Sequence, residues 1–336
     1  MSEHESCAIP SMAVREVLSD PAAEPLAVAL VAGDDGLDNL INRARVQKPG
    51  LALAGFLEYI HPGRVQILGK SEMAFLSERA PAERGRIVAQ LCRHGVSCLL
   101  VTNGHAPHEE MLDEADRHRV PLLTTARKTS EVIDGITRFL EDRLAPREVV
   151  HGVLMEVYGL GVFILGDSGV GKSECALDLV VRGHRLVSDD VVEIKRVGQV
   201  LDGTGPELTR YHMELRGLGI VNVKDLFGVA AVRLTKHVEL VIRLDPWQPG
   251  KRYDRLGLDE QRFEILGIEL PYVEMPVGPG RNLSVLIEVA ARNHLLKRKG
   301  FHPARELARR LGERLKSAGD DDRAAAYDHD PEDAEA

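Results

Sequence analysis

A glycine-rich segment near the middle of the chain has the spacing of a phosphate-binding loop. Its residues are Gly166, Asp167, Ser168, Gly169, Val170, Gly171, Lys172 and Ser173, which fit the pattern G-x-x-x-x-G-K-[ST]. Glycine at the fixed positions lets main-chain N–H groups approach phosphate oxygens. Lys172 supplies a cation for the β- and γ-phosphates, and Ser173 offers a hydroxyl ligand to Mg²⁺. The segment therefore predicts a site for a nucleoside triphosphate.

Two adjacent carboxylates, Asp189 and Asp190, follow a short apolar stretch after this loop. Near a bound nucleotide, a carboxylate can hold Mg²⁺ or accept the proton of an attacking hydroxyl. Neighbouring residues on a strand point to opposite faces, so we expect only one of the two to face the γ-phosphate. Asp245, at the end of the apolar run 241–244, is a competing candidate for holding Mg²⁺. We prefer Asp190 for the acid–base role because it follows the loop and its helix directly.

Three further segments combine glycine with charged side chains. Glu214 and Arg216 precede a Gly-x-Gly, which suits a mobile loop that brings charge to the phosphates but equally suits a simple hairpin. Residues 250–257 contain three cations, among them Arg255, and an arginine can stabilise a phosphoryl group during transfer. Arg281 stands just before a predicted helix, so it belongs either to an anion site or to an ordinary loop that leads into the helix.

The phosphate-binding segment lies between a predicted strand and a predicted helix, which is the arrangement this motif requires. The strand is the apolar run Val162–Leu165, and the helix covers 174–182, which lacks Gly and Pro. We expect further elements to complete an α/β domain around them. The other predicted strands are 153–157, 191–195, 229–234 and 238–244, and the other predicted helices are 283–298 and 303–317.

A smaller α/β domain is predicted in residues 1–145, before a linker that contains Pro146. Strands alternate with helices along it. The predicted strands are 26–31, 65–68, 97–101 and 120–123, and the predicted helices are 82–94, 107–119 and 130–144. Ser130 has the side chain of a cap for the last helix. No catalytic motif is evident in this part, and His105 and His108 are explained at least as well as loop residues as they are as metal ligands.

The composition is that of an ordinary globular protein, with 44% hydrophobic residues and a net charge of −9. Residues 320–336 contribute −7 of this charge, so the remainder lacks the basic character of a nucleic-acid-binding protein. We expect residues 318–336 to form an acidic, disordered tail. The four cysteines show neither C-x-x-C nor zinc spacing, and no run is long enough to span a bilayer. We therefore expect a cytoplasmic protein with neither nucleic-acid nor membrane partners.

Four motifs together resemble those of the bacterial HPr kinase/phosphorylase family. They are Gly166–Glu174, Ser188–Asp190, Leu215–Val223 and Tyr253–Gly257. The Arg-Gly-Leu-Gly-Ile stretch that starts at Arg216 is the most diagnostic, because ordinary phosphate-loop proteins lack it. The likeness extends into the first domain through Arg45 and the segments 49–55 and 64–70, so it covers about residues 25–315.

This resemblance implies a bifunctional enzyme that uses ATP and Mg²⁺ to phosphorylate a serine of HPr, a small phosphocarrier protein. It also implies removal of that phosphate by attack of inorganic phosphate, with release of pyrophosphate. The implied fold is a small N-terminal α/β domain, residues 1–145, followed by a P-loop kinase domain, residues 149–317, that resembles phosphoenolpyruvate carboxykinase. The implied assembly is a homohexamer.

The resemblance also implies roles for individual residues. The residues that match the family's catalytic groups are His151, Lys172, Asp190 and Arg255. Asp190 is then the base that takes the serine proton and returns a proton in the reverse reaction. The residues that match Mg²⁺ ligands are Ser173 and Glu214. The segments 213–222 and 276–281 match stretches tied to catalysis and to dephosphorylation, and Arg281 adds a further cation to the phosphate pocket.

Three other functions are compatible with the same residues. A regulatory GTPase is suggested by two D-x-x-G matches, at Asp202 and Asp254, but the chain has no N-K-x-D motif for guanine. A small-molecule kinase of the carboxykinase type needs the same loop and carboxylate. An ATP-gated binding module would act through the first domain without catalysis. A phosphate on an HPr serine after incubation with ATP and Mg²⁺ distinguishes the enzyme that the resemblance implies from these alternatives.

Overall fold

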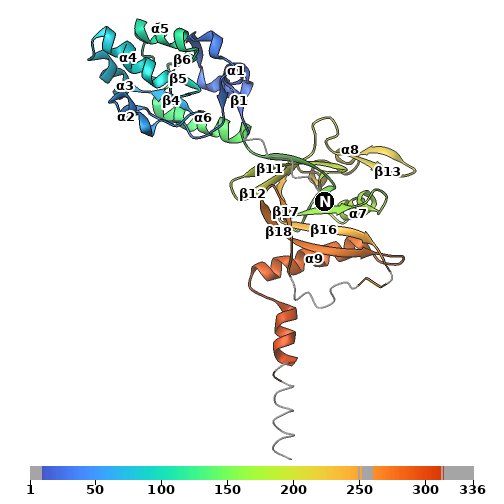
Figure 1. Ribbon diagram of the computed structural model, residues 1–336. Coiled ribbons are helices and arrows are strands. Elements are labelled where there is room, and N and C mark those ends of the chain that lie inside the picture. The colour runs from blue at the N-terminus through green and yellow to red at the C-terminus, as the bar shows by residue number, and fades with distance from the viewer. Residues whose placement is uncertain (1–9, 249, 252–259, 312, 314–336) are drawn as a thin grey trace, which may run out of the picture. The chain divides into compact units, whose positions relative to one another are not determined.

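The computed structural model describes residues 10–248, 250–251, 260–311 and 313. The chain divides into two compact units, Met1–Pro146 and Arg147–Ala336. Both are mixed α/β structures, which confirms the predicted fold class (Figure 1). Within the described residues, no helix combines the length and the apolar character needed to cross a membrane.

A sheet of four described strands forms the centre of the first unit. In sheet order they are β2 (Ala29–Ala32), β6 (Leu122–Thr124), β5 (Cys98–Val101) and β4 (Val65–Leu68). Strands β4, β5 and β6 run parallel, and β2 pairs with β6 in the antiparallel sense. One face packs against Leu76 and Leu91, and the other against Ile136 and Leu140. Because both faces are covered, β5 is a continuous buried run without alternation.

Helices and short strands surround this sheet. They are β1 (Met12–Ala13), α1 (Val14–Ser19), β3 (Leu40–Ile41), α2 (Gly50–Leu53), α3 (Lys70–Ser77), α4 (Pro81–Cys92), α5 (Glu109–His118) and α6 (Thr129–Arg143). Three 3-10 turns, Pro21–Leu26, Asp34–Gly36 and Leu57–Tyr59, join them. The three predicted helices are present, with ends shifted by a few residues. Ser130 does not cap α6, because the cap position is Lys128 and Ser130 already lies in the first turn.

The second unit contains a mixed sheet of six described strands. In sheet order they are β10 (Arg185–Ser188), β8 (Val153–Val157), β9 (Leu160–Gly166), β16 (Leu240–Pro246), β18 (Ile268–Val277) and β17 (Gln261–Ile265). Strands β9, β16 and β18 run parallel, whereas the flanking pairs are antiparallel. The carboxyl ends of the three parallel strands therefore share one edge of the sheet.

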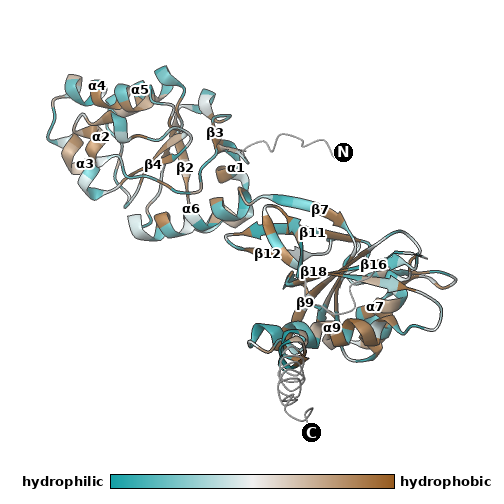
Figure 2. Ribbon diagram, turned by 60° about the horizontal axis from the view of Figure 1, so that its bottom comes forward, coloured by the Kyte–Doolittle hydropathy of each residue, from teal (hydrophilic) through white to brown (hydrophobic). Residues whose placement is uncertain are grey.

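Strand β9 is buried on both faces because each face has its own covering layer. Val162 and Ile164 pack with helices α7 (Lys172–Val181) and α9 (Leu283–Arg298). Phe163 and Leu165 point the other way, into a cluster with strand β11 (Val191–Val197). Strand β11 belongs to a second sheet of four described strands, with β7 (Arg147–His151), β12 (Val200–Thr204) and β15 (Thr235–His237). Figure 2 shows the apolar residues, in brown, along β9, β16 and β18.

A separate hairpin, β13 (His212–Leu215) and β14 (Gly219–Asn222), precedes helix α8 (Val223–Phe227). The glycines of this segment therefore serve a hairpin, the simpler of the two alternatives drawn from the sequence. The predicted strand 229–234 is wrong: Val229–Ala231 forms a 3-10 turn, and Val232 makes only an isolated bridge to Leu186. A short apolar run does not by itself distinguish a strand from other buried chain. Beyond α9, residues 303–311 are helical.

Candidate active site

The phosphate-binding segment connects β9 to α7, as its pattern predicts. Gly166 ends the strand and Lys172 begins the helix, with Gly171 at the cap position. The Nζ of Lys172 donates hydrogen bonds to the carbonyl oxygens of Gly166, at 2.8 Å, and of Asp167, at 3.0 Å. The ammonium group is thus held over the loop, beside the N–H groups of the first turn of α7. Both features favour a bound anion at this position.

Two glycines of the loop are needed for different reasons. Gly166 has φ of 150°, and a Cβ there would lie 2.7 Å from the carbonyl oxygen of Leu244 on β16. Gly169 has φ of 82°, and a Cβ there would lie 2.7 Å from a guanidinium nitrogen of Arg216. The first glycine lets β9 and β16 stay paired up to the start of the loop. The second lets a cation from the β13–β14 hairpin approach the loop backbone.

Asp189 is the carboxylate in contact with the loop. Its Oδ1 accepts a hydrogen bond from Ser173 Oγ at 3.0 Å, and its Oδ2 accepts one from the Glu214 main-chain N–H at 3.3 Å. Its side chain is buried. Burial raises the pKa of this carboxyl above its usual value, while the hydrogen bonds from Ser173 and Glu214 oppose that rise. One buried acid therefore holds the loop and the hairpin together.

Asp190 points away from this contact. The pair Asp189–Asp190 lies in the turn between β10 and β11 rather than on a strand, and Asp190 has φ of 67°. Its main-chain carbonyl accepts a hydrogen bond from Gly152 N–H at 2.9 Å. The side chain is 78% exposed and lies 3.8 Å, Oδ1 to Nδ1, from an equally exposed His151. The structure thus brings two of the predicted catalytic residues together at the surface, beside the buried acid.

His151 is positioned by the second sheet. It is the last residue of β7, and its register partner on β11 is Val191, which directly follows Asp190. This pairing fixes the histidine next to the Asp189–Asp190 turn. The family resemblance indicates His151 as a catalytic residue, but no local pattern in the sequence predicts β7 or its pairing with β11.

From the sequence, Arg216 could belong either to a mobile loop that brings charge to the phosphates or to a simple hairpin. It stands at the turn of the β13–β14 hairpin, and its guanidinium lies against Gly169. Among the described residues, no acidic side chain forms an ion pair with it. The cation is therefore available to phosphate oxygens held by the loop. Glu214, on β13, contributes its main-chain N–H to Asp189, and its own side chain is exposed.

Asp245 has a different environment from the other two aspartates. It lies near the end of β16 at the shared edge of the parallel strands, and its Oδ2 accepts a hydrogen bond from Lys251 Nζ at 2.8 Å. Lys251 also pairs with Glu274 on β18. The bond from Lys251 lowers the pKa of Asp245 below its usual value. The acid is thus engaged by a lysine, whereas Asp190 faces solvent.

Arg281 lies just before α9. Its Nη1 donates to the carbonyl oxygen of Pro276 at 2.8 Å, which fixes the guanidinium near the end of β18. Asn282 caps the helix by accepting a hydrogen bond from Val285 N–H. The segment is thus a loop that leads into a helix, which is one of the two alternatives drawn from the sequence, and it presents a cation at the edge where the parallel strands end.

The oxygen donors around Ser173 suit Mg²⁺. In the described residues, no group of three or more His, Cys, Asp or Glu side chains is arranged to hold a metal by itself. Mg²⁺ at nucleotide sites usually takes one or two protein oxygens and completes its shell with phosphates and water. Ser173 Oγ and Asp189 Oδ1, 3.0 Å apart, provide that limited set. Asp189 is thus an additional ligand candidate that the motif assignment missed.

Part of the predicted site lies outside the described residues. This applies to Arg255 with the whole segment Tyr253–Gly257, and to the acidic tail 318–336. His105 and His108 fall in the first unit, where His108 Nε2 is 3.0 Å from Ser77 Oγ. Neither belongs to a metal-holding group among the described residues.

Two family models match the chain in succession. "HPr Serine kinase N terminus" matches residues 13–140, and "HPr Serine kinase C-terminal domain" matches residues 142–311. The second match contains the phosphate loop, Asp189 and Asp190, the hairpin and α9. Together the two matches span nearly the whole described chain.

Individual relatives show the same likeness over most of their length. The HPr kinase/phosphorylase of Geobacter sulfurreducens is 48% identical over 91% of this chain and 96% of that protein. The HPr kinase/phosphorylase of Brevibacillus brevis is 44% identical over 88% of this chain and 95% of that protein. A solved Hpr(Ser) kinase/phosphatase from Coxiella burnetii is 38% identical, with a TM-score of 0.43, over 46% of this chain and 93% of that one. The family models and the curated relatives show that this chain belongs to the HPr kinase/phosphorylase family.

Proposed function

We propose that this protein transfers the γ-phosphoryl group of ATP to a serine of HPr and also removes it by attack of inorganic phosphate, which releases pyrophosphate. One observation carries the proposal. A phosphate loop is tied by Ser173 to a buried acid, Asp189, and the next residue, Asp190, is an exposed acid beside His151. Adjacent Cα atoms are about 3.8 Å apart, so a carboxylate that faces solvent stands next to the phosphate site.

The loop binds and orients the nucleotide in this proposal. Main-chain N–H groups at the start of α7, with Lys172 and Arg216, would contact the phosphate oxygens. Mg²⁺ would be held by Ser173, Asp189 and Glu214, and when bound it would offset negative charge on the phosphates. The site therefore supplies positioning and positive charge, which are the main protein contributions to phosphoryl transfer.

Asp190 is the base in the forward direction. It would accept the proton of the serine hydroxyl as the oxygen attacks phosphorus, with His151 beside it. Arg255 is proposed, from the resemblance alone, to stabilise charge on the phosphoryl group. In the reverse direction the same carboxyl, now protonated, returns a proton to the serine oxygen while phosphate attacks the phosphoserine. Arg281 and Lys172 would help to bind that incoming phosphate.

The exposure of the acid–base pair favours a protein acceptor over a small molecule. The side chains of His151 and Asp190 are 81% and 78% exposed. Small-molecule sites are usually concave and bury most of the ligand. A protein substrate, in contrast, covers an exposed base when it docks and so excludes water itself. The exposed pair therefore fits a protein kinase better than the carboxykinase-type alternative.

The proposal includes an assignment for each region. Residues 1–145 form the N-terminal α/β domain, residues 149–317 form the catalytic domain, and residues 318–336 form an acidic tail. The family resemblance also leads us to propose a homohexamer in the cytoplasm. Size-exclusion chromatography with light scattering tests the assembly directly, and a monomer at working concentration would contradict it.

The activity is tested with the full-length protein, ATP, Mg²⁺ and purified HPr. We expect mass spectrometry to find one phosphoryl group on an HPr serine, and we expect added phosphate to remove it with release of pyrophosphate. Lys172→Ala serves as the control that removes the loop cation. ATP turnover with unmodified HPr would contradict the proposal and would favour a regulatory NTPase.

A further inference from the structure

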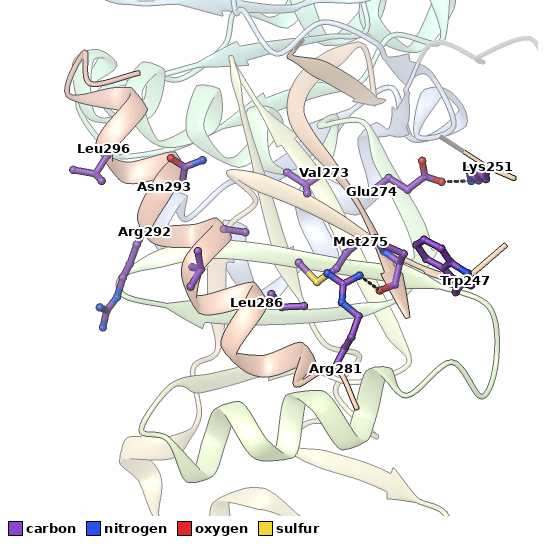
Figure 3. A pocket seen from close by; sticks show the side chains of 13 residues that line it. Trp247, Lys251, Val273, Glu274, Met275, Arg281, Leu286, Arg292, Asn293 and Leu296 are labelled. Atoms are coloured by element: carbon purple, nitrogen blue, oxygen red, sulfur yellow. Dashed lines mark hydrogen bonds and ion pairs between the residues drawn. The ribbon is translucent and has the colours of Figure 1, made fainter. Parts of the chain in front are cut away.

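A cavity of about 920 Å³ lies between helix α9 and strand β18. Leu286, Val289 and Leu296 form one wall, on α9, and Val273 and Met275 form the other, on β18. Trp247, which follows β16, also lines the cavity. Figure 3 shows the helix on one side and these strand residues on the other, with Arg281 near the start of the helix. Of its lining residues, the proposed reaction steps use only Arg281.

The sheet register places this cavity close to the phosphate loop. Gly166, at the start of the loop, is opposite Leu244 on β16, and Leu244 is opposite Met275 on β18. Neighbouring strands lie about 4.8 Å apart, so the backbone of Met275 is about 10 Å from that of Gly166. The three strands are parallel and end at the same edge. Ligands of open α/β sheets bind outside such carboxyl ends, so one ligand can reach from the loop to the cavity.

The lining has the character of a site for a flat, partly apolar group. Aliphatic side chains and an indole form most of it, and a few polar groups, including Asn293 and the guanidinium of Arg281, stand among them. An aromatic base gains from apolar contact and from stacking, and its edge needs a small number of hydrogen-bonding partners. The volume lies in the usual range for small-molecule and cofactor sites. Inorganic phosphate and pyrophosphate have no part that would use such walls.

We propose that this cavity binds the base and ribose of the nucleotide whose phosphates occupy the loop. This inference rests on the proposed function, because it assigns a second subsite for the same ATP. Arg281, held near the end of β18 by its hydrogen bond to Pro276, is then a cation of the base and ribose subsite.

A consequence is that the two phosphoryl donors of the reversible reaction differ in their need for the cavity. When the dephosphorylation runs backwards, a P–O bond of pyrophosphate breaks, its phosphoryl group passes to the serine oxygen, the serine proton goes to Asp190, and phosphate leaves. That donor fills only the loop. ATP fills the loop and the cavity. Blocking the cavity should therefore weaken ATP while sparing pyrophosphate.

The single tryptophan of the chain permits a direct binding test. Because Trp247 is the only tryptophan in the sequence, the intrinsic indole emission of the whole protein reports on this cavity. We expect saturating ATP with Mg²⁺ to change the emission clearly and saturating pyrophosphate with Mg²⁺ to leave it nearly unchanged. Equal changes with both, or no change while calorimetry shows bound ATP, would overturn the proposal.

A matched pair of variants on one helix provides the kinetic test. Val289→Arg places a large side chain in the cavity from a position that is 57% exposed, so folding should tolerate it. Val285→Arg adds the same charge to α9 at a 38% exposed position outside the cavity lining. Loss of the base contacts should raise the KM for ATP by about tenfold or more in Val289→Arg, which corresponds to about 1.4 kcal/mol. Val285→Arg should change it by less than about twofold.

Pyrophosphate-driven phosphorylation of HPr is the second readout for both variants. We expect it to stay close to wild type in each. An unchanged KM for ATP in Val289→Arg, or an equal loss with ATP and with pyrophosphate, would overturn the cavity assignment. Failure of the proposed function is distinguishable, because the wild type would then phosphorylate HPr with neither donor. The Trp247 titration involves no HPr and would still decide whether the cavity binds the nucleoside.

Discussion

Replacing Asp190 by asparagine should remove phosphoryl transfer without disturbing the fold. The Asp190 side chain is 78% exposed, and its ion pair with His151 is long, at 3.8 Å. Exposed pairs of this kind contribute at most about 1 kcal/mol to stability. The backbone at this position is left-handed, with φ of 67°, a conformation that asparagine adopts at least as readily as aspartate. We therefore expect the melting temperature to shift by no more than about 4 °C.

The catalytic effect should be much larger than the structural one. A positioned general base typically contributes about 10²–10⁴ in rate, or about 3–5 kcal/mol of transition-state stabilisation. Asp190→Asn should lose that factor in kcat for HPr phosphorylation, while calorimetry finds ATP affinity within about threefold of wild type. Asp245→Asn is the matched comparison. Its carboxylate is engaged by Lys251, so we expect a loss of less than about tenfold.

Initial rates of HPr phosphorylation, followed by mass spectrometry at saturating ATP, measure both variants. Equal loss in Asp190→Asn and Asp245→Asn would refute the assignment of the base. A large fall in ATP affinity in Asp190→Asn would also refute it, because the exposed side chain would then belong to the nucleotide site.

Three further predictions follow from the same geometry. Gly169→Ala should lower ATP affinity by about tenfold in calorimetry, because a Cβ there displaces the Arg216 guanidinium and strains a backbone with φ of 82°. An unchanged affinity would show that Arg216 does not contact the bound nucleotide. The pKa of Asp189 is raised in the folded protein, so the folded protein holds the carboxyl proton more tightly than the unfolded chain does. The contribution of Asp189 to the free energy of unfolding therefore falls as the pH rises from 3.8, the usual pKa of an aspartate, through the raised pKa. Melting curves at several pH values should therefore show a smaller fall over that window in Asp189→Asn than in the wild type, and parallel profiles would contradict this. Burial raises the pKa of the Cys175 thiol to about 12, and that of two other buried cysteines likewise, so these thiols should resist iodoacetamide until the protein is denatured, as peptide mass analysis will show.

The sequence was sufficient where the local pattern alone determines structure. The loop between β9 and α7 follows from glycine spacing, and strand Val153–Val157 and helix Leu283–Arg298 have the predicted bounds. Gly152 directly precedes the strand, and the cap residue Asn282 directly precedes the helix. Motifs with a fixed backbone geometry are the most predictable kind of site.

Which of the two adjacent aspartates, Asp189 or Asp190, contacts the loop could not be predicted in the same way. The expectation that one faces the loop assumed strand alternation, but both residues lie in a turn. Which one is buried depends on the left-handed backbone at Asp190 and on a register shift between Leu186 and Ser188 where β10 pairs with β8. The contact between Arg216 and Gly169 joins residues from two separate elements. Neither feature has a signal in local periodicity.

The bond between Asp189 and the hairpin uses the main-chain N–H of Glu214 rather than its side chain. Every amino acid except proline carries that group. Position 214 can therefore change its side chain freely without detaching β13 from the acid that also holds Ser173. Glu214→Gln removes a candidate ligand charge and leaves the attachment intact. Glu214→Pro removes both the carboxylate and the main-chain N–H, so the difference between the two variants isolates the effect of the attachment.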